Sequence, residues 1–124
     1  MGRKVVVLGE CDYCGTELVF EKMPGSKSFI ARDSVKIKRC IRCGAPAVYI
    51  KGSGVVKCSA GCFPFFVKDP VISQDGEGKV LIGRLELYQN PKSLKKFYCP
   101  SCGEPLLQRF RVKRVRVCVK RERA

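Results

Sequence analysis

Four close pairs of cysteines constrain the fold of this 124-residue chain more than any other feature. Three of the pairs have two residues between their cysteines and a glycine directly after the second one. A turn of this form points two thiolates at one metal ion, and the glycine lets the turn close. Because two pairs complete one tetrahedral site, the sequence predicts two structural Zn²⁺ ions, with iron as the less favoured metal. The pairs are Cys11/Cys14, Cys40/Cys43, Cys58/Cys62 and Cys99/Cys102.

Disulfide bonds are the main alternative use of these cysteines. Two residues between partners make a strained disulfide ring, which disfavours bonds within a pair. Residues 1–10 lack the apolar run of a secretory signal peptide, so we expect a cytoplasmic protein, and spaced cysteines in that reducing compartment usually bind metals. The chain has one Asn, three Gln and no His, and hyperthermophiles favour such a composition. Their cytosols tolerate disulfides.

The apolar residues predict strands rather than helices. Valine occurs 15 times against 5 alanines, and apolar positions alternate with polar ones. We therefore expect an all-β protein with no interior domain boundary, so that residues 1–124 form a single domain. The expected strands cover residues 4–8, 18–22, 29–39, 47–51, 55–57, 65–68, 80–88 and 106–120, and residues 91–96 form a helical turn.

Residues 40–62 contain a complete unit of cysteine turn, hairpin and second cysteine pair. Cys40-Ile41-Arg42-Cys43-Gly44 precedes the expected strand 47–51, the glycine-rich turn 52–54 and the pair Cys58/Cys62. This unit resembles the zinc ribbons of transcription initiation factors and of type I topoisomerases, although the three residues between Cys58 and Cys62 depart from the usual two. The resemblance implies a zinc ribbon nested within a larger antiparallel β domain, with one metal bound by Cys40, Cys43, Cys58 and Cys62.

The two outer pairs share the pattern CxxCGxxL at residues 11–18 and 99–106. Their turns, at residues 11–15 and 99–103, resemble the paired turns of rubredoxin-like ribbons. Under the nested pairing that the ribbon resemblance implies, the second metal is bound by Cys11, Cys14, Cys99 and Cys102. A tandem pairing, of the first pair with the second and of the third with the fourth, remains the alternative, because loop-closure entropy separates the two by only tenths of a kcal/mol.

The chain is strongly basic, with 25 Lys and Arg against 11 Asp and Glu and a net charge of +14. Four thiolates around Zn²⁺ carry a net −2, so two filled sites lower this charge by four, to +10. Such a surplus favours a polyanionic partner, and nucleic acid is the one we predict. The residues expected to contact it are Lys36, Lys38, Arg39, Arg42, Arg109, Arg111, Lys113, Arg114, Arg116, Lys120, Arg121 and Arg123.

Eight of these cations lie in the last sixteen residues, where basic and apolar residues alternate and the alternation changes phase at Lys113-Arg114. A β-bulge at that point would keep one face of the strand basic throughout. The alternative is an edge strand whose charges only prevent aggregation. The ninth cysteine, Cys118, falls in the same stretch and is expected to be a small strand residue.

The aromatic residues divide into expected core and expected contact residues. Tyr13, inside a cysteine turn, and Tyr49, on the ribbon hairpin, are candidates for contact with bases. The residues expected in the core are Phe20, Phe63, Phe65, Phe66 and Phe97.

These features together predict a non-enzymatic zinc-ribbon protein that binds DNA or RNA through a basic β surface. The lack of histidine excludes Ser-His and Cys-His catalysis, and four-cysteine zinc sites leave no open coordination position. The alternative is an interaction or structural module that meets an acidic protein partner, such as a polymerase or a virion component. An electron carrier is a third hypothesis, which requires iron.

Overall fold

The computed structural model describes residues 2–76, 78–94, 96–106 and 111–117. Within them the chain is all β, as the sequence predicts, with no α-helix and one antiparallel sheet. The short 3-10 turn η1 (Pro91–Ser93) lies between the last two strands. The strands are β1 (Gly2–Glu10), β2 (Glu17–Lys22), β3 (Phe29–Ala31), β4 (Val35–Ile37), β5 (Ala47–Ile50), β6 (Val55–Cys58), β7 (Phe65–Asp75), β8 (Gly78–Leu87) and β9 (Arg111–Val117).

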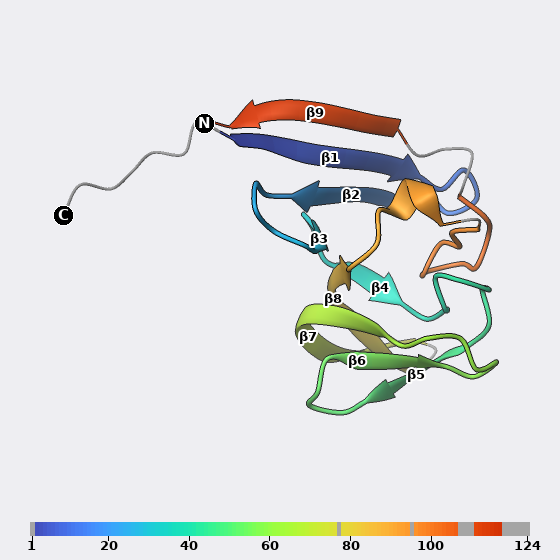
Figure 1. The fold of residues 1–124 in the computed structure, drawn as a ribbon. Helices are drawn as coiled ribbons and strands as arrows, with labels where there is room; N and C mark the ends of the chain where they lie inside the picture. Colours follow the sequence, from blue (N-terminus) through green and yellow to red (C-terminus); the bar gives the residue numbers. More distant parts are fainter. Residues whose placement is uncertain (1, 77, 95, 107–110, 118–124) are drawn as a thin grey trace.

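The sheet has two halves that meet at β8. Its strand order is β5-β6-β7-β8-β3-β2-β1-β9, and β4 pairs with β8 beside β3. Figure 1 shows β1, β2 and β9 at one end and β5, β6 and β7 at the other. β8 pairs with β7 from Glu86 to Gly78 on one side, and with β3 and then β4 on the other. The two halves therefore depend on one central strand.

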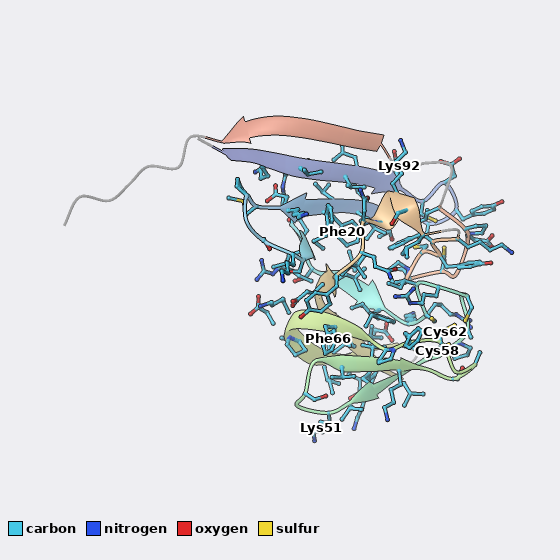
Figure 2. All side chains as sticks on the ribbon, in the orientation of Figure 1. Phe20, Lys51, Cys58, Cys62, Phe66 and Lys92 are labelled. Atoms are coloured by element: carbon cyan, nitrogen blue, oxygen red, sulfur yellow. The ribbon has the colours of Figure 1, made fainter. Side chains whose placement is uncertain are left out.

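One core of buried residues spans both halves of the sheet. It includes Val7 of β1, Val56 of β6 and Leu85 of β8, each fully buried. Phe20 of β2 packs edge-on against Phe97, with ring centroids 6.0 Å apart. Figure 2 labels Phe20 near η1, inside the half that contains β1 and β2. Cys11 and Cys99 belong to the same core, so the cysteine turns are continuous with it.

The expected strand at residues 29–39 is divided in the structure. β3 ends at Ala31 and β4 begins at Val35, and the three residues between them are exposed. The Arg32 N–H donates to the carbonyl of Val19 instead of continuing along β8. The division lets β3 pair with both β2 and β8, whereas β4 pairs with β8 alone.

Two of the five phenylalanines expected in the core are exposed, which corrects that prediction. Phe20, Phe65 and Phe97 are buried, but Phe63 is 78 % exposed and Phe66 is 39 % exposed. The reason for Phe66 is strand alternation, because its neighbours Phe65 and Val67 occupy the core face of β7. Because Phe65 is buried, the next residue of the strand, Phe66, faces solvent.

The register of β9 shows that the predicted bulge in the basic tail is wrong. Its register against β1 runs without a shift from Leu8↔Arg111 to Gly2↔Val117. An unbroken strand alternates between two faces, so positions 111 and 113 belong to one face and positions 114 and 116 to the other. The described part of the tail therefore has cationic positions on both faces of the strand.

The β7–β8 hairpin bends at its centre. Its register shifts between Lys68 and Val71, where Asp69 has a φ of 53°. Opposite the bend, Gly83 lets the two strands approach, because a Cβ there would overlap Val67 Cγ1 and lie 3.0 Å from the Lys68 carbonyl oxygen.

No helix among the described residues is long and apolar enough to cross a membrane.

We expect the substitution Gly83→Ala to destabilise the folded protein by about 1–3 kcal/mol, because the added methyl must displace the β7 backbone or the Val67 side chain. The measurement is denaturant unfolding with saturating metal. Gly76→Ala is the matched control, since a Cβ at Gly76 would meet no atom within 4 Å. Equal stability of the two variants would contradict the close approach at Gly83.

Candidate metal centres

Three of the four cysteine pairs form the same turn, which we call a knuckle. The first knuckle covers residues 11–16, the second residues 40–45 and the third residues 99–104. In each, the first cysteine N–H donates to the carbonyl five residues later, at 2.7–2.9 Å. The glycine N–H donates back to the carbonyl of that cysteine, at 2.8–2.9 Å. The glycines are Gly15, Gly44 and Gly103, with φ of 73°, 73° and 83°, a conformation that explains the residue type.

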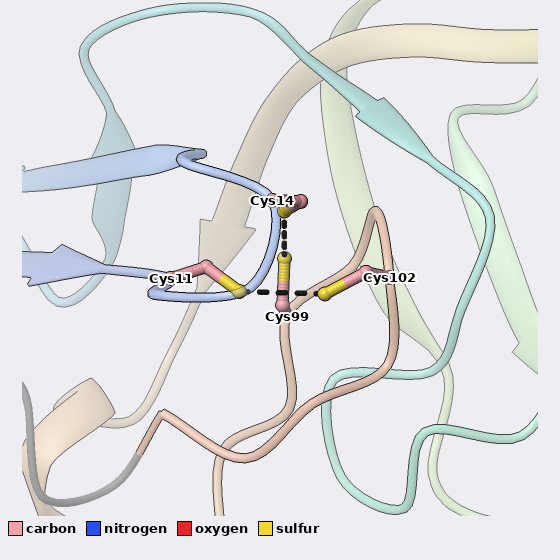
Figure 3. A group of neighbouring side chains, drawn as sticks. All are labelled: Cys11, Cys14, Cys99 and Cys102. Carbon is pink, nitrogen blue, oxygen red and sulfur yellow. Dashed lines mark hydrogen bonds between the residues drawn. The ribbon is translucent and has the colours of Figure 1, made fainter.

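The first metal centre joins the first and third knuckles. The first knuckle connects β1 to β2, and the third follows η1 and is closed by a bridge between Tyr98 and Pro105. Cys11 Sγ lies 3.3 Å from Cys102 Sγ, and Cys14 Sγ lies 3.6 Å from Cys99 Sγ. Figure 3 shows the four sulfurs turned toward a common centre.

The second metal centre joins the second knuckle, between β4 and β5, to the end of β6. Cys43 Sγ lies 3.3 Å from Cys58 Sγ, and Cys40 and Cys62 complete the cluster. The pair Cys58/Cys62 closes differently from a knuckle. Its extra residue places Gly61 at a φ of 92°, and the Ala60 N–H donates to Cys58 Sγ at 3.2 Å. The longer spacing therefore still directs both sulfurs to one point.

The sulfur spacing fits a metal ion. All four sulfurs of each cluster lie within 4.8 Å of one another, and a tetrahedron of Zn–S bonds of about 2.3 Å has edges of about 3.8 Å. A disulfide would require a sulfur–sulfur distance of about 2.05 Å, and all eight cysteines are free. The clusters follow the nested pairing: the first and second pairs, which the tandem pairing would join, lie in different clusters.

The thiols within each cluster influence one another's ionisation. Burial raises the pKa of Cys40 and of Cys99. Burial also acts to raise the pKa of Cys58, but hydrogen bonds from the Cys62 N–H, the Cys43 thiol and the Ala60 N–H together outweigh it and lower that pKa to about 6. The hydrogen bond with Cys43, together with burial, raises the pKa of Cys62 to about 12. Four neighbouring thiolates therefore need a cation in order to ionise together, and this is the state that binds metal.

The second and third knuckles bind each other directly, although they belong to different metal centres. The Arg39 N–H donates to the Pro100 carbonyl at 2.8 Å, and the Tyr98 N–H donates to the Ile41 carbonyl at 2.7 Å. In both bonds the donor precedes the first cysteine of its knuckle and the acceptor follows the first cysteine of the other. The two knuckles are thus related by a local pseudo-twofold arrangement.

Two glycines permit this approach of the knuckles. A Cβ at Gly44 would lie 2.9 Å from the Gly103 carbonyl oxygen and 3.1 Å from the Tyr98 ring. A Cβ at Gly103 would lie 3.3 Å from the Gly44 carbonyl oxygen. The sequence does not predict this contact. The knuckle glycines are needed for their φ values in all three turns, so the sequence does not distinguish the two that also touch.

The residues predicted to contact nucleic acid are dispersed. Lys36 and Arg39 are exposed beside the second knuckle, while Lys38 Nζ lies 3.9 Å from Asp75 Oδ2 and Arg42 is half-buried. Arg111, Lys113, Arg114 and Arg116 lie in β9. Tyr13 is 74 % exposed, whereas Tyr49 packs against the core and its hydroxyl donates to the Lys79 carbonyl. Outside the described residues lie Arg109, Cys118, Lys120, Arg121 and Arg123.

Fold and site together define an all-β module with two four-cysteine clusters, each suited to bind a metal ion. No family model, curated protein or solved structure matches the chain.

The grouping of the cysteines can be tested with two double variants of the full chain loaded with Co²⁺. Cys43→Ser/Cys62→Ser removes ligands from one cluster, so we expect one Co²⁺ per chain with the visible spectrum of four thiolate ligands. Cys14→Ser/Cys43→Ser removes a ligand from each cluster, so no such spectrum should remain. Tandem pairing gives the reverse result for the two variants.

The contact between the knuckles predicts that the centres stabilise each other. Gly15 and Gly44 have the same φ of 73°, but a Cβ at Gly15 would meet no atom within 4 Å. We expect Gly15→Ala to cost about 1–2 kcal/mol of stability, from its left-handed backbone alone, and Gly44→Ala to cost more. Competition with a chelator should show that Gly44→Ala weakens metal binding at both centres and Gly15→Ala mainly at the first. Equal effects of the two variants would contradict the coupling.

Proposed function

We propose that this protein is a non-enzymatic zinc-ribbon protein that binds nucleic acid. The observation that carries the proposal is the net charge of +14, on a fold whose thiolate clusters fit closed, structural Zn²⁺ sites. Zinc is favoured over iron because four thiolates at a tetrahedral site with no required redox step are typical of structural zinc. Metal analysis tests this choice, and an iron-loaded chain would be red.

Exposed cations beside the metal centres support the proposal. Lys36 and Arg39 flank the second knuckle, and Lys51 and Lys57 are exposed on the hairpin of β5 and β6. β9, with its four cationic positions, lies at the end of the sheet beside β1. Several separate sets of cations are suited to phosphates along a polymer rather than to one small anion.

Two further parts of the proposal follow from the chemistry of the clusters. A closed four-thiolate site has no position for substrate or water, which favours a structural role over catalysis. Thiolates must also remain reduced in order to bind metal, so we propose a reducing, cytoplasmic location.

A protein partner is the second candidate, and the sheet edge at β5 favours it. β5 is the last strand of its half, and Val48 and Ile50 are 54 % and 41 % exposed there. An apolar strand at a sheet edge is able to add a strand from another protein. An acidic partner would complement the net charge.

Nucleic-acid binding predicts a steep salt dependence. If about six cations meet duplex phosphates, log K should fall against log salt with a slope of roughly −5. Replacing Arg111, Lys113, Arg114 and Arg116 with Ala should weaken binding to all sequences alike and reduce the slope by about one for each cation that meets a phosphate in the wild type. Anisotropy titrations at several salt concentrations measure both quantities.

The control for this experiment replaces Arg32 and Arg84, whose side chains pair with Glu21 and Asp69, with Ala. This change should reduce the slope less for each charge removed. Retention of the wild-type slope by the quadruple variant would show that the β9 cations take no part. No binding at low salt to any nucleic acid would refute the proposed function.

A further inference from the structure

The outer face of β5, β6 and β7 is a solvent-exposed surface with both apolar and cationic residues. We call it the ribbon face and define it by Val48, Ile50, Lys57, Phe66 and Lys68. The register places them on one side: Val48 is opposite Lys57, and Val55, two residues from Lys57, is opposite Phe66. The alternate residues Tyr49, Val56 and Phe65 face the core. All five residues of the ribbon face are exposed.

An aromatic pair lies at the β7 side of this face. Phe66 is 39 % exposed and Tyr88, directly after β8, is 62 % exposed. Their rings meet edge to face, with centroids 5.9 Å apart. Figure 2 places Phe66 on β7, well apart from the Phe20 core. Two neighbouring aromatics with exposed ring surface give a platform on which a flat ligand can stack.

A cavity of about 120 Å³ opens beside the pair, lined by Arg42, Phe66, Glu86 and Tyr88 among others. Arg42 comes from the second knuckle, so the metal centre positions it. Its Nε is buried and has no hydrogen-bond partner among the residues that the structure describes. A buried donor without a partner is unfavourable, and an acceptor atom from a ligand would satisfy it.

Glu86 gives the cavity an acceptor as well as a donor. Its carboxylate lies 3.7 Å from Lys68 Nζ, and its hydrogen bond with Tyr88 raises the pKa of that phenol. The carboxylate would repel a phosphate placed in the cavity, but it can accept from an exocyclic amino group of a base. The polar groups of the cavity therefore fit a nucleobase better than a phosphate.

We propose that the ribbon face binds single-stranded nucleic acid, with one base stacked on one ring of the Phe66–Tyr88 pair and in edge contact with the other, and its polar edge between Arg42 and Glu86. This inference rests on the proposed function and makes it more specific. In a duplex the ring faces are covered by neighbouring bases, so only a single strand offers them to an aromatic pair. The phosphates on either side of the bound base follow the exposed Lys57 and Lys68.

The test uses the full-length, metal-loaded protein and labelled oligonucleotides of one sequence, as single-stranded DNA, single-stranded RNA and duplex DNA. We expect tighter binding to single strands than to the duplex. Phe66→Ala and Tyr88→Ala should each weaken single-strand binding by roughly 5- to 150-fold, which is the usual range for removal of one stacked base. Neither variant should change the salt slope, because neither removes a charge.

Three further variants separate stacking from general surface effects. Arg42→Lys keeps the charge and should still weaken single-strand binding, because it lacks the planar guanidinium. Met23→Ala removes an exposed side chain directly after β2, and Val71→Ala removes an exposed side chain from β7 beyond its bend. Both should bind as the wild type does. Chelator competition confirms that each variant retains both metals.

The outcomes distinguish this inference from the proposed function. If the aromatic variants bind single strands as tightly as the wild type, or if Met23→Ala or Val71→Ala weakens binding as much, the inference is wrong although nucleic-acid binding stands. If the wild type binds no oligonucleotide at low salt, the proposed function fails and the inference with it. Binding of a polyglutamate peptide instead, weakened by Phe66→Ala, would assign the ribbon face to an acidic protein.

Discussion

Four thiolates within 4.8 Å of one another are the constraint on which the rest of the structure depends. Their mutual repulsion keeps part of each cluster protonated unless a divalent cation is bound. A bound metal would therefore stabilise the fold as well as occupy the site. At the first centre it joins residues 11–14 to residues 99–102, so it closes a loop that contains most of the sheet. We therefore expect metal binding to be coupled to folding, as it is in other small four-cysteine domains.

The second and third knuckles belong to different metal centres and contact each other. A constraint that metal binding places on one centre therefore also acts on the other. The N–H groups of residues just before each knuckle donate to a carbonyl of the other: Lys38 and Arg39 to Pro100, and Tyr98 to Ile41. A knuckle that opened would remove a hydrogen-bond partner from its neighbour as well as two sulfurs from its own cluster. Together with β8 and the shared core, this contact joins the half of the sheet that contains β5, β6 and β7 to the half that contains β1 and β2.

The sequence predicts the fold class and the metal ligands because both depend on short-range patterns. Alternating apolar residues indicate strands, and CxxCG indicates a knuckle, without knowledge of the rest of the chain. The interruption between β3 and β4 depends on the pairing of β8 with two partners, which is a long-range property. The same holds for the exposure of Phe66: its neighbours Phe65 and Val67 are also apolar, so only the register decides which of them faces the core.

The exposed aromatic pair also shows how stability and binding compete on this sheet. Burying a phenylalanine side chain contributes roughly 1.5–3 kcal/mol, and Phe66 and Tyr88 forgo much of it while the core holds Phe20, Phe65 and Phe97. The neighbouring cations do not offset that deficit, because Lys68 Nζ pairs with Glu86 and Arg84 Nη2 with Asp69 at the surface, where ion pairs contribute little. Arg42 adds a buried donor without an acceptor at the same place. The exposed Phe66 ring, the exposed Tyr88 ring and the unpaired Arg42 Nε lie around one cavity beside a metal centre. A ligand that covers the rings and accepts from Arg42 explains all three features better than three separate packing defects do.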